Sequence, residues 1–284
     1  MRTVAPVSFV AGLLVSGAAL AECPTAEVIQ NFVQDWQAKR PAKALPVSDM
    51  KDAVCARDKV VEALTDSQGK VVGYKAGLTA KAVQERFNWN APVAGLLLEK
   101  MVLKDGAAVP AAYGARPVWE ADMLLVVKDD GVNQAKTPEE ALRHISGMRP
   151  YIELNDIALG PNEKIDGFQL IAINVAARLG VAGPEVPLED TPKTLKRLAE
   201  AKIVATDGSG AILAEGIGAA TLGNPLSVVV WLAEDLAKNG RKLKTGDLIS
   251  VGAFSPLTPP KPGQTVTVRY DGLPNTPKVS VRFE

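Results

Sequence analysis

Two carboxylates separated by one residue interrupt an otherwise apolar segment, Arg116–Val127. The segment contains β-branched residues and ends in a continuous hydrophobic run, which predicts a strand. Because side chains two residues apart on a strand point to the same face, we expect Glu120 and Asp122 to lie side by side. Two like charges there repel each other unless something neutralises them. A hard divalent cation can do so, since Mg²⁺, Mn²⁺ and Ca²⁺ accept carboxylate ligands.

A third carboxylate, Glu153, lies about 30 residues further on, in a second segment whose alternation predicts a strand. Ile152 and Leu154 flank it, so the acid again sits among apolar neighbours. The alternative for all three acids is a solvated strand face that carries ordinary surface charges. Residue types and spacing alone leave both interpretations open.

Lys75 is a further candidate because it lies between two glycines, Gly73 and Gly77, in a segment that begins as a strand. Glycine lets the backbone approach a ligand closely. The alternative is a lysine exposed to solvent. Thr79 is expected to cap a helix that covers residues 80–87.

The composition excludes several classes of function. A chain of 284 residues with 47% hydrophobic residues can form one large domain, or one domain with an extension. Lysine and arginine total 32, as do aspartate and glutamate, and no basic stripe is present, so nucleic acid is not an expected partner. His144 is the only histidine, which excludes a His-rich metal site, and we expect it to face solvent or to be structural. Gly216-x-Gly218 lacks the rest of a dinucleotide fingerprint and favours tight backbone passage instead.

Residues 1–21 have the features of a secretory signal. Arg2 supplies the positive start, Val4–Val15 an apolar stretch, and Ala19-Leu20-Ala21 a cleavage site. The alternative is an uncleaved membrane anchor, which the small residues at the end of the stretch disfavour. We therefore expect a secreted or periplasmic protein with no membrane association after the signal is removed.

The chain has two cysteines, Cys23 and Cys55. In an oxidising compartment, an isolated pair of this kind is a candidate disulfide. Closing the loop would stabilise the fold by about 3–4 kcal/mol in the chain-entropy model. The alternative is a pair of buried, unpaired thiols.

Hydrophobic periodicity predicts a mixture of helices and strands, with more strands in the second half. The predicted helices cover residues 26–38, 51–65, 80–87, 138–147, 194–199 and 225–239. The predicted strands include a hairpin over 202–206 and 211–215, followed by 248–253, 265–270 and 278–283. Residues 165–181 have no clear assignment. The pattern indicates an α+β fold with a mixed or antiparallel core, divided into a signal (1–21), a helical arm (22–69) and a main domain (70–284).

Several motifs together resemble the fumarylacetoacetate hydrolase superfamily, in the branch of 2-oxopent-4-enoate hydratases and 4-oxalocrotonate decarboxylases. They follow the family's order and spacing from about residue 25 to the end of the chain. They are GYKAGLT at 73–79, the Glu120 and Glu153 strands, residues 216–226, 230–233, 246–249 and 252–253, and Lys261-Pro262-Gly263. The resemblance implies a mixed β-sheet roll or sandwich with the N-terminal helices packed outside, and self-association as a homo-oligomer.

The resemblance also implies a cofactor, Mg²⁺ or Mn²⁺, held by Glu120, Asp122 and Glu153. Aspartate replaces the family's second glutamate, so the ion would lie nearer that strand or be reached through water. In the family, a small 2-oxo acid chelates the metal, which acts as a Lewis acid that stabilises an enolate.

Other residues acquire roles by the same resemblance. Lys75 would hold the substrate carboxylate, or shuttle a proton if burial lowers its pKa. Leu78, Ser255 and Pro256 would line the substrate pocket.

The chain departs from the family pattern at two places. Val93 stands where the family often has an acid, and Ile173-Asn174-Val175-Ala176 replaces Asp-Asn-Ala-Ser, keeping only Asn174. The lost groups help to position water and protons, and a general acid or base typically contributes ~10²–10⁴ in rate. Activity could therefore be weak, altered or absent.

Three functions follow from these observations. The first is a metal-dependent hydratase or decarboxylase that acts on small 2-oxo or 2-hydroxydienoic acids such as 2-oxopent-4-enoate, as in aromatic catabolism. The second is an acylpyruvate-type hydrolase on the same scaffold. The third is a secreted, non-catalytic relative that binds a metal or ligand, which the signal segment and the missing polar residues favour.

Overall fold

The computed structural model describes residues 23–284, so the predicted signal at residues 1–21 lies outside the described part of the chain. The α-helices of this part are α1 (Ala26–Gln37), α2 (Met50–Gln68), α3 (Lys81–Arg86), α4 (Pro138–Leu142), α5 (Gly167–Ala172), α6 (Pro192–Glu200) and α7 (Pro225–Lys238). The strands are β1 (Val71–Gly77), β2 (Val93–Leu98), β3 (Val102–Lys104), β4 (Ala107–Val109), β5 (Pro117–Val127), β6 (Ile145–Asp156), β7 (Leu179–Ala182), β8 (Val186–Pro187), β9 (Lys202–Asp207), β10 (Ile212–Ile217), β11 (Leu248–Ser250), β12 (Thr265–Asp271) and β13 (Lys278–Phe283).

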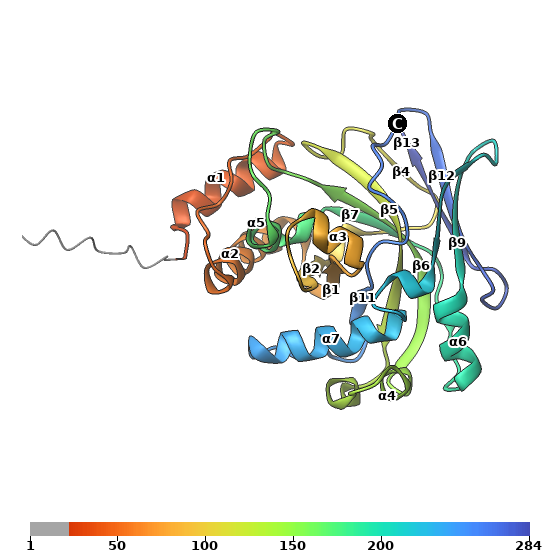
Figure 1. Cartoon of the computed structure of the whole chain (residues 1–284). Helices are drawn as coiled ribbons and strands as arrows, with labels where there is room; N and C mark the ends of the chain where they lie inside the picture. Colours follow the sequence, from red (N-terminus) through yellow and green to blue (C-terminus); the bar gives the residue numbers. More distant parts are fainter. Residues whose placement is uncertain (1–22) are drawn as a thin grey trace, which may run out of the picture.

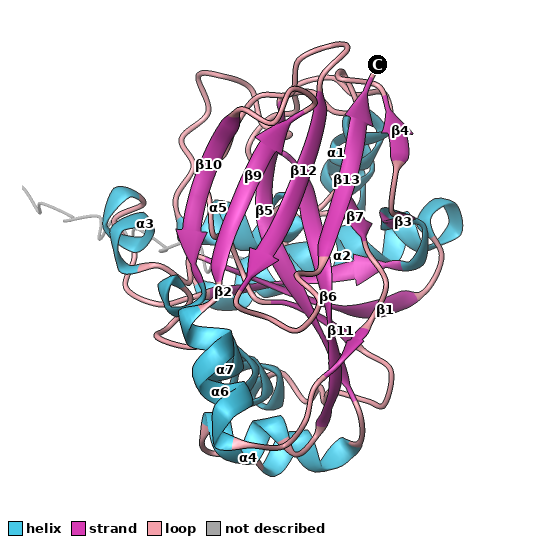
Figure 2. Cartoon of the chain, turned by 90° about the vertical axis from the view of Figure 1, so that its right-hand side faces the viewer, coloured by secondary structure: helices cyan, strands magenta, loops and turns pink. Residues whose placement is uncertain are grey.

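The strands form two mixed sheets that pack face to face. The larger sheet has the order β2-β1-β11-β5-β6-β7-β3, with β8 paired to β6, and the smaller has the order β10-β9-β12-β13-β4. Strands β12 and β13 of the smaller sheet contact β6, and the layering is visible in Figure 2. Helices α1, α2 and α5 cover the opposite side of the larger sheet (Figure 1). The predicted α+β fold, a mixed sheet sandwich with N-terminal helices outside, is confirmed.

The long antiparallel pair of β5 and β6 forms the centre of the larger sheet. Residues 119–127 of β5 are all buried, which agrees with its apolar sequence. The pairing extends to Val127 opposite Ile145. This pairing overturns the helix predicted over 138–147, since α4 ends at Leu142 and His144 lies just before β6.

The cap predicted for α3 is also wrong. The helix begins after Ala80 without a side-chain cap, and Thr79 is instead buried. A Cβ added at Gly252 would lie 2.2 Å from Thr79 Oγ1, so this threonine packs against the loop after β11. Packing at this position therefore overrides the local capping preference.

The two N-terminal helices share the core of the sheets. Phe32 and Trp36 of α1 and Val60 of α2 belong to the same hydrophobic cluster as the strands. The Arg178 guanidinium lies 4.1 Å from the centre of the Trp36 ring and also bonds to Asp156, which ties α1 to the end of β6. The predicted division between residues 69 and 70 stays a prediction.

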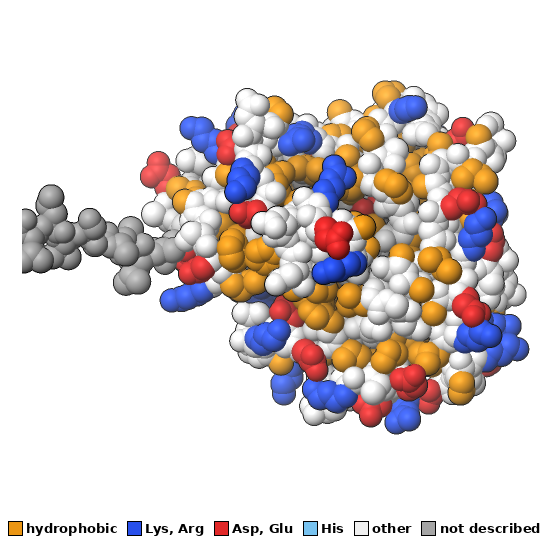
Figure 3. All heavy atoms as spheres, in the orientation of Figure 1, with side chains coloured by type: hydrophobic (Ala, Val, Ile, Leu, Met, Phe, Trp, Pro, Cys, Tyr) orange, Lys and Arg blue, Asp and Glu red, His pale blue; other side chains and the backbone are white. Residues whose placement is uncertain are grey.

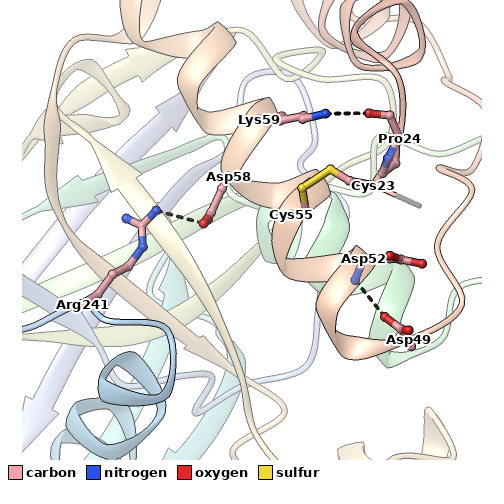
Figure 4. The surroundings of a disulfide bond; sticks show 8 residues. All are labelled: Cys23, Pro24, Asp49, Asp52, Cys55, Asp58, Lys59 and Arg241. Atoms are coloured by element: carbon pink, nitrogen blue, oxygen red, sulfur yellow. Dashed lines mark hydrogen bonds and ion pairs between the residues drawn. A yellow bond between two sulfur atoms is a disulfide. The ribbon is translucent and has the colours of Figure 1, made fainter. Parts of the chain in front are cut away.

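A disulfide joins Cys23 to Cys55 on α2 (Figure 4). Beside it, Lys59 Nζ donates to the Pro24 carbonyl at 3.0 Å. Further along α2, Asp58 pairs with Arg241 at 3.0 Å. These contacts fasten the start of the described chain to α2, and α2 to the segment after α7.

Charged side chains of both signs are interspersed over the face shown in Figure 3, and hydrophobic side chains gather near its centre. Among residues 23–284, no helix has the length and apolarity that crossing a bilayer requires.

Removing the disulfide should lower the free energy of unfolding by about 3–4 kcal/mol, because the bond closes a loop between residues 32 apart. We expect the Cys23→Ser/Cys55→Ser variant to unfold at a lower urea concentration in equilibrium measurements. Dithiothreitol should lower the midpoint of the unmodified protein and leave that of the variant unchanged. Equal midpoints for the oxidised protein and the variant would contradict this account.

Candidate metal centre

Glu120 and Glu153 lie directly opposite each other on β5 and β6. Both are buried, with 9% and 2% of their surface exposed. Opposite residues of an antiparallel pair have their Cβ atoms about 5 Å apart on one face of the sheet. The structure therefore brings together two of the three predicted acids from separate segments of the chain.

The side-chain amide of Asn155 joins these two acids. Its nitrogen Nδ2 donates to Glu120 Oε1 at 3.0 Å and to Glu153 Oε2 at 3.1 Å. Its oxygen Oδ1 accepts from Lys75 Nζ at 2.6 Å. The sequence analysis did not select Asn155, although its spacing of two from Glu153 places it on the same face of the strand.

Lys75 lies on β1 and is also buried. Besides Asn155, its ammonium contacts Glu153 Oε1 at 2.8 Å and donates to the Val175 carbonyl at 2.8 Å. The solvent-exposed alternative for Lys75 is therefore wrong. The space beside its two glycines is filled by protein, since a Cβ at Gly73 would collide with the Leu248 backbone and one at Gly77 with Val175.

Asp122 is fully buried but is held differently from the two glutamates. One oxygen accepts from the Ser250 hydroxyl, and the other accepts from the backbone amides of Gly252 at 3.1 Å and Met123 at 2.5 Å. Both oxygens are thus engaged by protein donors. Among the described residues 23–284, no three His, Cys, Asp or Glu side chains are arranged to hold a metal ion. The three-carboxylate ligand set therefore stays a prediction.

Burial and mutual repulsion change the protonation of these acids. Burial, and then the charge of Glu153, raise the pKa of Glu120 well above its usual value, although Lys75 opposes the rise. The same two causes raise the pKa of Asp122 to about 7, against the hydrogen bonds from Ser250 and Met123. Uptake of a proton is one way to relieve the crowding of negative charge, and binding of a cation is another.

A tyrosine from the smaller sheet fixes the strands at this site. The Tyr270 hydroxyl donates to the carbonyl of Asp122 and accepts from the amide of Tyr151 at 3.0 Å. Asp122 and Tyr151 are opposite each other on β5 and β6, so one hydroxyl bonds to both strands beside the acids. Tyr270 is 119 residues from Tyr151 in the sequence, and no local pattern indicates this contact.

Residues 174–176 form an unusual left-handed turn. Asn174, Val175 and Ala176 have φ values of 56°, 52° and 56°, which are strained for residues other than glycine, above all for a β-branched one. The Asn174 amide bonds to both backbone groups of Leu96, which anchors the turn on β2. The turn presents the Val175 carbonyl to Lys75.

Two departures from the family pattern, Val93 and Val175, lie in an apolar cluster beside this turn, whereas Ile173 belongs to the main core. Val93, Val175 and Leu78 pack together in a small buried cluster that also contains Ala53 and Ile171. The position at which the family resemblance predicts an acid is therefore filled by hydrocarbon. Leu78, predicted to bind substrate, has a left-handed backbone, and its carbonyl accepts from Gln84 at 2.8 Å.

Ser255 and Pro256 lie in the loop that follows β11. The Ser255 hydroxyl accepts from the amide of Ala121, the residue between Glu120 and Asp122, at 2.8 Å. Pro256 is exposed, and its carbonyl accepts from Thr258. Ser255 thus adjoins the acidic strand, while the substrate contacts predicted for Leu78, Ser255 and Pro256 stay predictions.

The pair of glutamates fits a hard divalent cation. If all three acids ionise, the single ammonium of Lys75 leaves two negative charges uncompensated in a buried site. Lys75 compensates Glu153 directly, since its ammonium lies 2.8 Å from Glu153 Oε1, and this leaves Glu120 and Asp122 without a cationic partner of their own. Carboxylate oxygens are the ligands that Mg²⁺ and Mn²⁺ prefer. Asp122 Oδ1 accepts two hydrogen bonds and Oδ2 accepts one, so Oδ2 is the oxygen of Asp122 that keeps a lone pair for a cation.

Comparison with curated proteins identifies related enzymes, although no family model matches the chain. The chain is 34% identical over 205 residues to 2-keto-4-pentenoate hydratase of Burkholderia vietnamiensis, which covers 72% of this chain and 76% of that protein. It is 30% identical over 232 residues to 2-keto-4-pentenoate hydratase 1 of Dechloromonas aromatica, covering 81% and 86%.

Comparison with solved structures identifies relatives of the same kind. The chain is similar to 4-oxalocrotonate decarboxylase from Pseudomonas putida G7 complexed with calcium and acetate, with a TM-score of 0.79, 25% identity, and coverage of 92% of this chain and 98% of that one. The complex of the same enzyme with magnesium and adipate has a TM-score of 0.77 and 25% identity, covering 91% and 97%. These relatives hold divalent metals and small carboxylates.

The variant Asp122→Asn should weaken the pH dependence of stability of the metal-free protein. Asp122 titrates near 3.8 when unfolded and near 7 when folded, so between these values the folded state binds the extra proton. Its contribution to stability is complete below about pH 4 and is lost as the pH rises through 7. Urea unfolding with EDTA should therefore show a smaller loss of stability from pH 5 to pH 8 in the variant, by up to about 3 kcal/mol.

A matched control is Asp190→Asn, since 57% of the Asp190 side chain is exposed. This variant should keep the pH dependence of the unmodified protein. If Asp122→Asn also keeps it, Asp122 does not titrate as described.

Proposed function

Because this chain belongs to the fumarylacetoacetate hydrolase superfamily, in the branch of 2-keto-4-pentenoate hydratases and 4-oxalocrotonate decarboxylases, we propose that it is a divalent-metal-dependent lyase. Its substrates would be small 2-oxo or 2-hydroxydienoic acids such as 2-oxopent-4-enoate, and hydration would be its reaction. The observation that carries the proposal is the buried pair of Glu120 and Glu153, set beside Lys75.

Glu120 and Glu153 would hold Mg²⁺ or Mn²⁺, with Asp122 as the third predicted ligand. The bound ion supplies Lewis acidity, which stabilises negative charge that develops on a 2-oxo acid. Lys75 offsets part of the negative charge of the site and keeps Glu153 in place through their contact at 2.8 Å. Val175, a member of the apolar cluster around Leu78, accepts a hydrogen bond from Lys75 through its carbonyl, and Lys75 itself is only 2% exposed.

A non-catalytic, metal-binding relative is the second candidate. The buried apolar residues Val93, Ile173 and Ala176, which replace polar groups of the family pattern, favour it. Both candidates require metal binding, so they differ only in turnover. Loss of the ultraviolet absorbance of 2-hydroxypenta-2,4-dienoate, dependent on Mg²⁺ or Mn²⁺ and abolished by EDTA, would select the enzyme.

We also propose that the protein is exported to the periplasm or beyond. The signal-like composition of residues 1–21 supports this. The disulfide between Cys23 and Cys55 supports it as well, since such bonds persist in oxidising compartments.

Replacing Glu120 by glutamine should abolish most turnover of the dienoate, by roughly 100-fold or more, because the ion would lose a charged ligand. The measurement is the initial rate at saturating Mg²⁺, with the metal content of the purified protein determined in parallel. The control is Glu234→Gln, on the surface of α7, which should retain the full rate. Equal rates and metal contents for Glu120→Gln and the unmodified protein would overturn the proposal.

A further inference from the structure

The Asn155 side chain contacts three charged groups at once within the buried site. It bonds to Glu120, Glu153 and Lys75 at 3.0, 3.1 and 2.6 Å, and only 3% of its surface is exposed. We propose that Asn155 is a positioning residue, which holds one oxygen of each glutamate and so orders the pair as ligands of a shared divalent cation. This inference rests on the proposed function, because it concerns the metal ligands of that site.

The chemistry of the neighbours fixes the orientation of the amide. The Lys75 ammonium has no acceptor, so it must face the Asn155 carbonyl oxygen. The two carboxylates accept hydrogen bonds, so they must face the NH₂ group. A flipped amide would place donor against donor and oxygen against carboxylate.

The two N–H groups of this amide are divided between the glutamates. Glu120 uses Oε1 and Glu153 uses Oε2, so Glu120 Oε2 and Glu153 Oε1 are not held by Asn155. Glu153 Oε1 is contacted by the Lys75 ammonium at 2.8 Å, so of these two oxygens only Glu120 Oε2 has no partner among residues 23–284. We therefore assign Glu120 Oε2 as the oxygen that faces the cation.

A neutral hydrogen-bond donor is better suited than a charged one to holding two glutamates that bind a cation. An amide satisfies the carboxylates without adding positive charge, so it does not compete electrostatically with the cation. The backbone of Asn155 is fixed as well, because this residue of β6 is paired with Val118 of β5. The glutamates are thereby ordered before an ion binds, which lowers the entropic cost of binding.

The test compares Mn²⁺ binding to the whole protein and to two variants, using the electron paramagnetic resonance signal of free Mn²⁺. Asn155→Leu keeps the branched shape of the side chain, at a larger volume, and removes all three hydrogen bonds. Asn155→Asp keeps an acceptor for Lys75 but cannot donate to the glutamates when ionised. We expect both variants to bind Mn²⁺ about 10–100-fold more weakly, the usual effect of losing a group that orients a metal ligand.

Asn155→Asp makes the test stringent. Its extra negative charge, acting alone, would make the variant bind Mn²⁺ more tightly than the unmodified protein. Weaker binding by Asn155→Asp therefore supports loss of positioning, and equal or tighter binding overturns the inference. This variant decides the question if Asn155→Leu does not fold, as judged by its thermal unfolding.

Glu120→Gln separates this inference from the proposed function. If the unmodified protein binds Mn²⁺ and only Glu120→Gln loses it, the metal site stands and the role of Asn155 is refuted. If the unmodified protein does not bind Mn²⁺, the proposed function fails, and the inference fails with it.

Discussion

The crowding of negative charge between β5 and β6 is the constraint on which the rest of the site depends. Glu120 and Glu153 face each other on one side of the sheet, with Asp122 nearby, and all three are buried. Buried charges of one sign must be compensated by a cation, a proton or hydrogen bonds. The fold supplies the Lys75 ammonium, the Asn155 amide, and the Ser250 hydroxyl with the Gly252 amide for Asp122.

These compensating groups come from strands that are far apart in the sequence but adjacent in the sheet. Lys75 lies on β1 and Ser250 on β11, which pairs with both β1 and β5. The smaller sheet contributes Tyr270, whose hydroxyl bonds to both acidic strands. The order of the strands therefore brings the hydrogen-bond donors close to the acids. The packing of the two sheets keeps the acidic strands in place.

Much of the arrangement could be predicted from local sequence. The alternation around Glu120 and Glu153 indicated their strands, and the Asp207-Gly208-Ser209-Gly210 turn indicated the hairpin of β9 and β10. Gly216 and Gly218 permit close backbone passage as predicted, since a Cβ at either would collide with a carbonyl oxygen.

The rest depends on contacts that a local pattern does not contain. The helix predicted through His144 is too long, because β6 pairs with β5 as far as Ile145. The two-residue period places Asn155 beside Glu153, but only the fold shows that Lys75 and Glu120 meet the same amide. The side-chain direction of Asp122 likewise depends on Ser250, 128 residues away.

The left-handed turn at residues 174–176 sets a limit on engineering this protein. Glycine at Val175 would relieve backbone strain, although it would also raise the conformational entropy of the unfolded chain. The same exchange would remove a side chain of the apolar cluster and loosen the carbonyl that meets Lys75. The backbone gain and the packing loss therefore oppose each other, so variants at this turn should be screened for heat resistance and for the order of Lys75 together.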